Sequence, residues 1–264
     1  MPLDYETEKV TFTGALGHEL SALVDRPVLE DGQEVRAWAL FAHGFSIGKD
    51  FKPLRTISRT LVKEGIGMMR FDFTGLGQSE GKFEDTNFST NVGDLLAAAG
   101  WLREHCRPPC FLIGHSFGGT AALKAADEIP ECKAVATIGS PADTTHIIHQ
   151  FADKIEEIIE DGEAQVMLAG RPFVIKEHFL KDAEAHDIME EVKDLNRALM
   201  IMHSPQDKVV SIDNASQIYI AAKHPKSFVS LDGADHLLLK DPADAEYIAR
   251  VLAAWADRYL EHVD

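Results

Sequence analysis

A single serine stands among glycines in the stretch GHSFG, residues 114–118. The apolar run before it, at 110–115, is typical of a buried strand, and the alanine-rich stretch after it, at 117–128, is typical of a helix. A sharp strand-to-helix turn holds such a serine in an unfavourable backbone conformation and exposes its hydroxyl, while small neighbours let other backbone come close. An ordinary glycine-rich turn is the alternative. The pattern predicts that Ser116 is a nucleophile.

A serine hydroxyl attacks only when a base accepts its proton and a third group orients that base. Asp207 and His236 follow Ser116 along the chain in that order, and each comes just after a predicted strand. Because the carboxyl ends of parallel strands meet at one edge of a sheet, we expect these side chains to lie together. His236 would take and return the proton, and Asp207 would hold the imidazole in one tautomer.

Two backbone NH groups are expected to bind the negative charge that develops on the attacked oxygen. The NH of Phe117 lies at the start of the predicted helix, where unpaired donors and the helix dipole favour an anion. The loop after the predicted strand 36–42 would supply the second NH from Phe45, with Gly44 letting the backbone turn back towards Ser116. The ring of Phe45 would either line an acyl pocket or serve packing.

Other residues compete for these roles. Asp235 adjoins His236, but neighbours in sequence rarely aim at each other in a tight turn, so Asp207 is the preferred acid. His146 and His149 lie three residues apart on a predicted helix and could share a metal ion, but no third ligand is evident. We therefore expect neither a metal nor a cofactor.

The elements that must position these residues alternate between strand-like and helix-like periods. The segments KVTFTG and ELSALVD predict an antiparallel hairpin at the start of the chain. Apolar strands are predicted at 36–42, 66–73, 110–115, 134–140, 198–204 and 227–233, and helices at 51–64, 87–104, 117–128, 213–222 and from Asp241 onward. This alternation predicts an α/β fold, with a mainly parallel sheet covered by helices on both faces.

Residues 142–197 break the alternation. They hold a predicted helix at 145–160, a small hairpin at 164–175 and a second helix from about Lys176. Because a structureless loop of that length is improbable in a compact domain, we interpret 142–197 as an inserted cap. The core would then comprise residues 1–141 and 198–264.

Apolar side chains of the predicted cap are candidates for contact with a substrate. Ile148, Phe151 and Phe173 could roof an acyl pocket together with Phe45. The alternative is that they pack the cap onto itself.

Composition limits the partners. The chain has 264 residues, of which 45% are apolar, and 43 acidic against 26 basic residues give a net charge of -17. A charge of this sign repels a phosphate backbone, so we expect no nucleic-acid partner. No uncharged apolar run approaches the roughly 20 residues that span a bilayer, and the N-terminus lacks a signal-peptide pattern. Three cysteines without a CxxC pair fit reduced thiols. We expect a cytoplasmic monomer or homodimer without a membrane partner.

In these motifs the chain resembles the α/β-hydrolase superfamily. HGF at 43–45, DFTGLGQSEG at 72–81, GHSFGG at 114–119, Asp207 and His236 stand in that family's order, and the resemblance covers nearly the whole chain. It implies the α/β-hydrolase fold and the activity of a carboxylesterase.

A closer resemblance is to the hydrolase half of bacterial bifunctional α/β-hydrolase/OsmC-like proteins. It is carried by the stretches RFDFTGLGQSEG, NFSTNVGDL, AVATIGSPAD, LAGRPFVI, IDNAS and HPKSFVSLDGADHLL. Those proteins continue into a thiol-peroxidase-type domain, whereas this sequence ends at Asp264, so peroxide reduction is not carried over.

The expected function is hydrolysis of a small-molecule ester, with a short acyl group, through an acyl-enzyme intermediate on Ser116. Two alternatives stay open. An amidase or peptidase would use the same residues, and a non-catalytic ligand receptor could keep the fold. A dehalogenase is disfavoured, because its nucleophile would be an aspartate where Ser116 stands.

Overall fold

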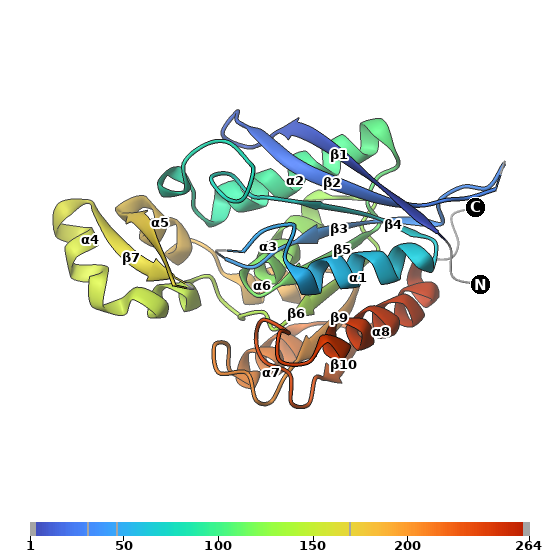
Figure 1. The fold of residues 1–264 in the computed structure, drawn as a ribbon. Helices are drawn as coiled ribbons and strands as arrows, with labels where there is room; N and C mark the ends of the chain where they lie inside the picture. Colours follow the sequence, from blue (N-terminus) through green and yellow to red (C-terminus); the bar gives the residue numbers. More distant parts are fainter. Residues whose placement is uncertain (1–3, 31, 46, 169, 261–264) are drawn as a thin grey trace.

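The computed structural model describes residues 4–30, 32–45, 47–168 and 170–260. An eight-stranded sheet in the order β1-β2-β4-β3-β5-β6-β9-β10 forms its centre (Figure 1). The strands are β1 Tyr5–Thr13, β2 Glu19–Pro27, β3 Ala37–Ala42, β4 Ile66–Phe71, β5 Phe111–His115, β6 Ala134–Ile138, β9 Ala198–His203 and β10 Lys226–Ser230.

The sheet is antiparallel at its start and parallel over the rest. β1 pairs with β2 and β2 with β4 in antiparallel register, while the remaining pairs of this sheet are parallel. Every residue of β3, β4, β5, β6 and β9 is buried, which is why these strands are apolar runs without alternation. The predicted hairpin and the predicted mainly parallel sheet are both confirmed.

Helices cover both faces of the sheet (Figure 1). α1 and α8 pack together on one face, and α2, α3 and α7 lie on the other. Their bounds are α1 Lys52–Lys63, α2 Phe88–His105, α3 Phe117–Ala125, α7 Ile212–Ala221 and α8 Pro242–Leu260, with short 3-10 helices η1 Phe83–Asp85 and η2 Ala126–Glu128. The last four positions of the predicted terminal helix, 261–264, lie outside the described residues.

The segment between β6 and β9 contains η3 Thr145–Lys154, α4 Ile155–Asp161, β7 Glu163–Leu168, β8 Arg171–Lys176, α5 Glu177–Glu184 and α6 Ile188–Asp194. β7 and β8 form a separate antiparallel pair, in the place of the predicted hairpin, whose position 169 lies outside the described residues. Figure 1 shows α4, β7 and α5 as a lobe beside the main sheet. α6 returns from this lobe to pack against α3 and α7.

The helix predicted at 145–160 is interrupted. Phe151 has φ -137° and ψ 35°, so the 3-10 segment η3 is kinked there, and the α-helix α4 begins only at Ile155. This break places the Phe151 ring inside the lobe, where the side chain is 1% exposed and packs edge-on against Phe179. Burial of the aromatic ring thus takes precedence over a continuous helix.

Polar contacts tie the lobe to the core. Asp182 on α5 accepts hydrogen bonds from the backbone NH and the hydroxyl of Ser89 in the first turn of α2, at 2.9 and 2.5 Å. Lys176 at the end of β8 forms an ion pair of 2.6 Å with Asp85 in η1. Since both partners in the core belong to 83–89, this short stretch holds the lobe in place.

In the part of the chain that the structure describes, no helix is long and apolar enough to cross a membrane. Cys106, Cys110 and Cys132 are free cysteines.

Candidate active site

Ser116 occupies the sharp turn between β5 and α3. Its backbone has φ 52° and ψ -129°, a left-handed conformation that a residue with a side chain rarely adopts. Its NH donates to the carbonyl of Ile138 on the neighbouring strand at 2.8 Å, and its carbonyl accepts from the NH of Gly119, also at 2.8 Å. The strained turn is therefore held from both sides.

Close backbone contacts explain the glycines around the serine. A Cβ on Gly114 would lie 2.3 Å from Cα of Gly119, and one on Gly118 would lie 2.3 Å from the carbonyl oxygen of His43. No side chain fits at such distances. The glycines let α3 approach both β5 and the loop after β3.

Loops after β9 and β10 bring the predicted acid and base to the serine. His236 Nε2 lies 3.0 Å from Ser116 Oγ, and His236 Nδ1 lies 2.8 Å from Asp207 Oδ2. The three residues come from distant parts of the chain and meet because their strands are parallel and end at one edge. With Nδ1 protonated, His236 donates to Asp207 and its Nε2 is free to accept from the serine hydroxyl.

Asp207 is almost wholly buried, with its side chain 2% exposed. Burial opposes its ionisation, but the hydrogen bond and charge of His236, together with NH donors, outweigh this and lower the pKa of Asp207. The donors are the NH groups of Val209 and Val210, which lie 2.8 and 3.0 Å from Oδ1. The carboxylate is therefore ionised near neutral pH and favours an adjacent imidazolium.

Two further histidines, His115 and His203, support the site. His115 Nε2 donates to the carbonyl oxygen of His236 at 2.8 Å, so the residue before the nucleophile holds the loop that carries the base. Burial lowers the pKa of His115 to about 3, which keeps its ring neutral. His203 Nε2 donates to the carbonyl oxygen of Val210 at 2.9 Å and thereby braces the turn that contains Asp207.

The loop after β3 lies against the turn that carries Ser116. A Cβ on Gly44 would lie 3.1 Å from the serine Cβ and 3.0 Å from Nδ1 of His115. Within the described ranges, neither the NH of Phe45 nor that of Phe117 donates a hydrogen bond to the protein. Both donors are thus open to a ligand, and their role in binding an oxyanion stays a prediction.

A buried ion pair anchors the same loop. Lys49 Nζ lies 2.5 Å from Asp72 Oδ2, and the Lys49 side chain is 1% exposed. Asp72 also accepts from the NH of Lys49 at 2.7 Å and from the NH of Gln78 at 2.9 Å. Asp72 is thus a structural carboxylate, and the sequence analysis missed the lysine that pairs with it.

A cavity of about 210 Å³ opens beside Ser116. It is lined by Gly44, Phe45, Ile47, His115, Ser116, Gln150, Val209, His236 and Leu237. Of the residues predicted to contact substrate, Phe45 is therefore in the lining.

Ile148, Phe151 and Phe173 are not among the residues that line this cavity. Ile148 is 8% exposed, and the ring of Phe173 packs 4.6 Å from the ring of Phe83. Their contact with a substrate stays a prediction. Gln150 takes the lining position in η3, and no pattern in the sequence distinguished it.

His146 and His149 do not form a metal site with other residues of the described ranges. Their rings lie 5.9 Å apart, and His146 Nε2 donates to the carbonyl oxygen of Val209 at 3.1 Å. Among the residues that the structure describes, no group of three or more histidines, cysteines and carboxylates is placed to hold a metal ion.

The parallel sheet, the serine on its strained turn and the histidine and aspartate on later strands define an α/β hydrolase. The chain belongs to the α/β-hydrolase family described as serine aminopeptidase, S33, whose model matches residues 33–166.

Individual relatives indicate which kinds of hydrolase the chain is similar to. The chain is 46% identical to the esterase domain of a Rhodothermus marinus protein, whose crystal structure matches over 97% of this chain and 99% of that one with a TM-score of 0.78. It is 24% identical over 212 residues to the mitochondrial palmitoyl-protein thioesterase ABHD10 of Rattus norvegicus, covering 78% of this chain and 70% of that protein.

The human ABHD10 is 26% identical over 161 residues, which are 58% of this chain and about half, 51%, of that protein. These relatives support a hydrolase of the esterase or thioesterase kind. The closer resemblance to bifunctional OsmC-like proteins stays a prediction.

Proposed function

We propose that this protein is a serine hydrolase that cleaves carboxylic esters with short acyl groups. The observation that carries the proposal is the unbroken chain of contacts from Ser116 Oγ through both nitrogens of His236 to Asp207 Oδ2, at 3.0 and 2.8 Å. Such a chain activates a hydroxyl that is otherwise a weak nucleophile.

In the first half of the proposed reaction, Ser116 Oγ attacks the ester carbonyl carbon while His236 Nε2 takes the hydroxyl proton. The NH groups of Phe45 and Phe117 stabilise the oxyanion, and Asp207 stabilises the imidazolium. The carbon–oxygen bond to the alcohol then breaks, and His236 returns its proton to the leaving alcohol. An acyl ester on Ser116 remains.

In the second half, water takes the place of the alcohol. His236 accepts a proton from this water as its oxygen attacks the acyl carbon, and the proton then returns to Ser116 Oγ as the carboxylic acid leaves. The protein ends in its starting state, and no redox step or cofactor is required.

The surroundings of Ser116 favour a small substrate. The cavity of about 210 Å³ is below the range of roughly 300–1,000 Å³ that is usual for drug-sized ligands. Ile47, Val209 and Leu237 offer apolar contact, and Gln150 adds an uncharged polar group from the cap. This lining suits a short neutral acyl group better than a long or anionic one.

Thioester hydrolysis is the second candidate, because the ABHD10 relatives are named thioesterases. The attack on the carbonyl is the same, and only the leaving atom differs. Amide hydrolysis, which the family description suggests, demands more of the same machinery, since His236 must protonate an amine as it leaves.

A matched substrate panel tests the proposal. p-Nitrophenyl esters from acetate to long chains, with the thioester and the anilide of the preferred acyl group, are assayed with wild type and Ser116→Ala. We expect the highest kcat/KM for a short ester and a loss of at least about 10³-fold in Ser116→Ala. A preference for the thioester would move the assignment to the second candidate. Turnover of none of these substrates would favour the non-catalytic receptor.

A further inference from the structure

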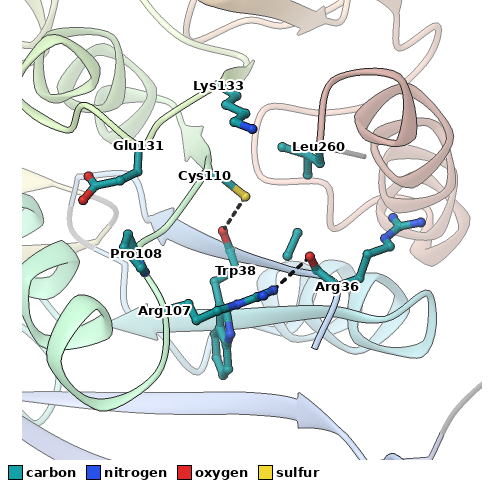
Figure 2. A pocket seen from close by; sticks show the side chains of 9 residues that line it. Arg36, Trp38, Arg107, Pro108, Cys110, Glu131, Lys133 and Leu260 are labelled. Atoms are coloured by element: carbon teal, nitrogen blue, oxygen red, sulfur yellow. Dashed lines mark hydrogen bonds between the residues drawn. The ribbon is translucent and has the colours of Figure 1, made fainter. Parts of the chain in front are cut away.

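A second hollow lies at the amino ends of β3, β5 and β6, at the sheet edge opposite Ser116 (Figure 2). Its volume is about 280 Å³, somewhat larger than the cavity beside the serine. The residues before β3, β5 and β6 and the end of α8 enclose it, so four separate parts of the chain contribute to one site.

The walls of this hollow are apolar. Trp38, Pro108, Cys110 and Leu260 line it, and Trp38 is 4% exposed. Figure 2 shows the Cys110 sulfur directed towards the carbonyl oxygen of Trp38, with which it forms a hydrogen bond of 3.6 Å. Burial raises the pKa of Cys110, so the thiol stays neutral and adds to the apolar surface.

Charged groups surround the apolar walls, and the carboxylates among them are already engaged. Glu131 turns away from the hollow (Figure 2) and accepts two hydrogen bonds from Arg103, at 2.8 and 2.7 Å. Arg36 pairs with Asp257 at 2.6 Å.

Arg107 and Lys133 are the other two cations that line the hollow, and they differ in their ion pairs. Arg107 pairs with Glu34 at 3.3 Å and also donates to backbone carbonyls of the loop before β3. Lys133 is exposed at the rim and, over the described ranges, forms no ion pair. One positive charge is therefore left unmatched beside an apolar hollow, in a protein whose net charge is -17.

We propose that this hollow is a binding site for a small apolar monocarboxylate. The hydrocarbon or aryl part would lie against Trp38, Cys110 and Leu260, and the carboxylate would accept a hydrogen bond from the Lys133 ammonium. A monoanion fits because a single cation, Lys133, is unmatched beside the hollow. The site lies away from Ser116 and does not depend on the proposed hydrolase activity.

The ligand used to test the site is octanoate. The control ligand is 1-octanol, which has the same chain length and no charge. Binding is measured by titration calorimetry on the full chain with Ser116→Ala, which removes turnover from the reading. The alkylation rate of Cys110 by iodoacetamide, in a Cys106→Ser background, reports whether the ligand occupies this hollow. We expect octanoate to bind, to slow alkylation of Cys110, and to bind at least about fivefold more tightly than octanol.

Reversing the charge of Lys133 tests whether octanoate binds in this hollow or elsewhere on the protein. Lys133→Glu should weaken octanoate binding about tenfold and leave octanol binding unchanged, as expected for the loss of one charge-assisted contact. Lys9→Glu, at an exposed position of β1, is the matched control and should have no effect. Octanoate that binds without protecting Cys110, or with equal affinity in Lys133→Glu, would overturn the proposal, as would no binding.

Discussion

At the scale of single residues, Asp207 contacts the base His236 and not the nucleophile Ser116. Its substitution therefore tests how the base is held and charged. Asp207→Asn can keep the hydrogen bonds from Val209 and Val210 through its amide oxygen. It loses the charge that favours the imidazolium and no longer selects the His236 tautomer that exposes Nε2 to Ser116. We expect kcat for a short ester to fall by about 10⁴-fold with little change in KM, measured by steady-state kinetics. A loss of less than tenfold would point to another acid, such as Asp235.

The lowered pKa of Asp207 also makes a prediction about stability. A carboxyl whose pKa is lower in the folded state stabilises the fold above its ordinary pKa, here 3.8, and loses that contribution as pH falls through the folded-state pKa. The difference in unfolding free energy between wild type and Asp207→Asn should therefore shrink as the pH falls below about 5. Urea unfolding across the acid range measures this difference. Asp153→Asn, at an exposed position, is the control, and a difference that grows towards low pH would contradict the prediction.

Side chains of the site divide into those that a sequence can indicate and those that it cannot. Ser116, Asp207 and His236 could be predicted because their order and their places after strands follow from the topology of a parallel sheet. Gln150 and Leu237 could not, because the direction of a side chain in a loop depends on contacts formed by distant segments. Lys49 could not be predicted either, because its burial depends on the ion pair with Asp72, 23 residues further along the chain.

At the scale of elements, a substitution of Gly118 tests the close contact between α3 and the loop after β3. Gly118→Ala would place a methyl group 2.3 Å from the carbonyl oxygen of His43, so α3 must move away from the loop after β3. We expect a loss of about 1–3 kcal/mol in unfolding free energy, and a drop in ester hydrolysis because the loop carries Phe45. Urea unfolding and kcat/KM measure the two effects.

Gly100→Ala is the matched control for that change. Gly100 lies inside α2, and a Cβ there meets nothing within 4 Å. The variant should be more stable than wild type by about 0.5–1 kcal/mol, because alanine favours a helix. If Gly118→Ala proved as stable and as active as wild type, the close approach of α3 to the loop would be wrong.

Periodicity predicted the elements of the main sheet and its helices better than those of the segment between β6 and β9. In the core, apolar strands and amphipathic helices repeat a pattern that sheet packing requires, as β5 and α1 illustrate. In η3 and α4, the burial of Phe151 overrides a helical pattern that is continuous in the sequence. Short elements such as these take their conformation from the surface on which they pack.

The whole molecule carries a charge of -17, and this bears on the choice of substrate. A negative surface potential lowers the local concentration of anions and is screened by salt, with a Debye length of about 10 Å at 0.1 M. Of two p-nitrophenyl esters with four-carbon acyl groups, one neutral and one carrying a free carboxylate at the far end of the acyl chain, the anionic one should show the higher KM at low salt. The ratio of the two KM values should fall as salt is raised. A ratio that does not depend on salt would contradict this view.

Covalent labelling of Ser116 tests the central claim most directly. A fluorophosphonate reacts rapidly with a serine that an adjacent base has activated and hardly at all with an ordinary serine. Mass spectrometry of the intact protein and of its peptides should find one adduct per chain, on Ser116, with no adduct in Ser116→Ala or in His236→Ala. Folded protein that takes up no label, or takes it at another residue, would contradict the proposed hydrolase.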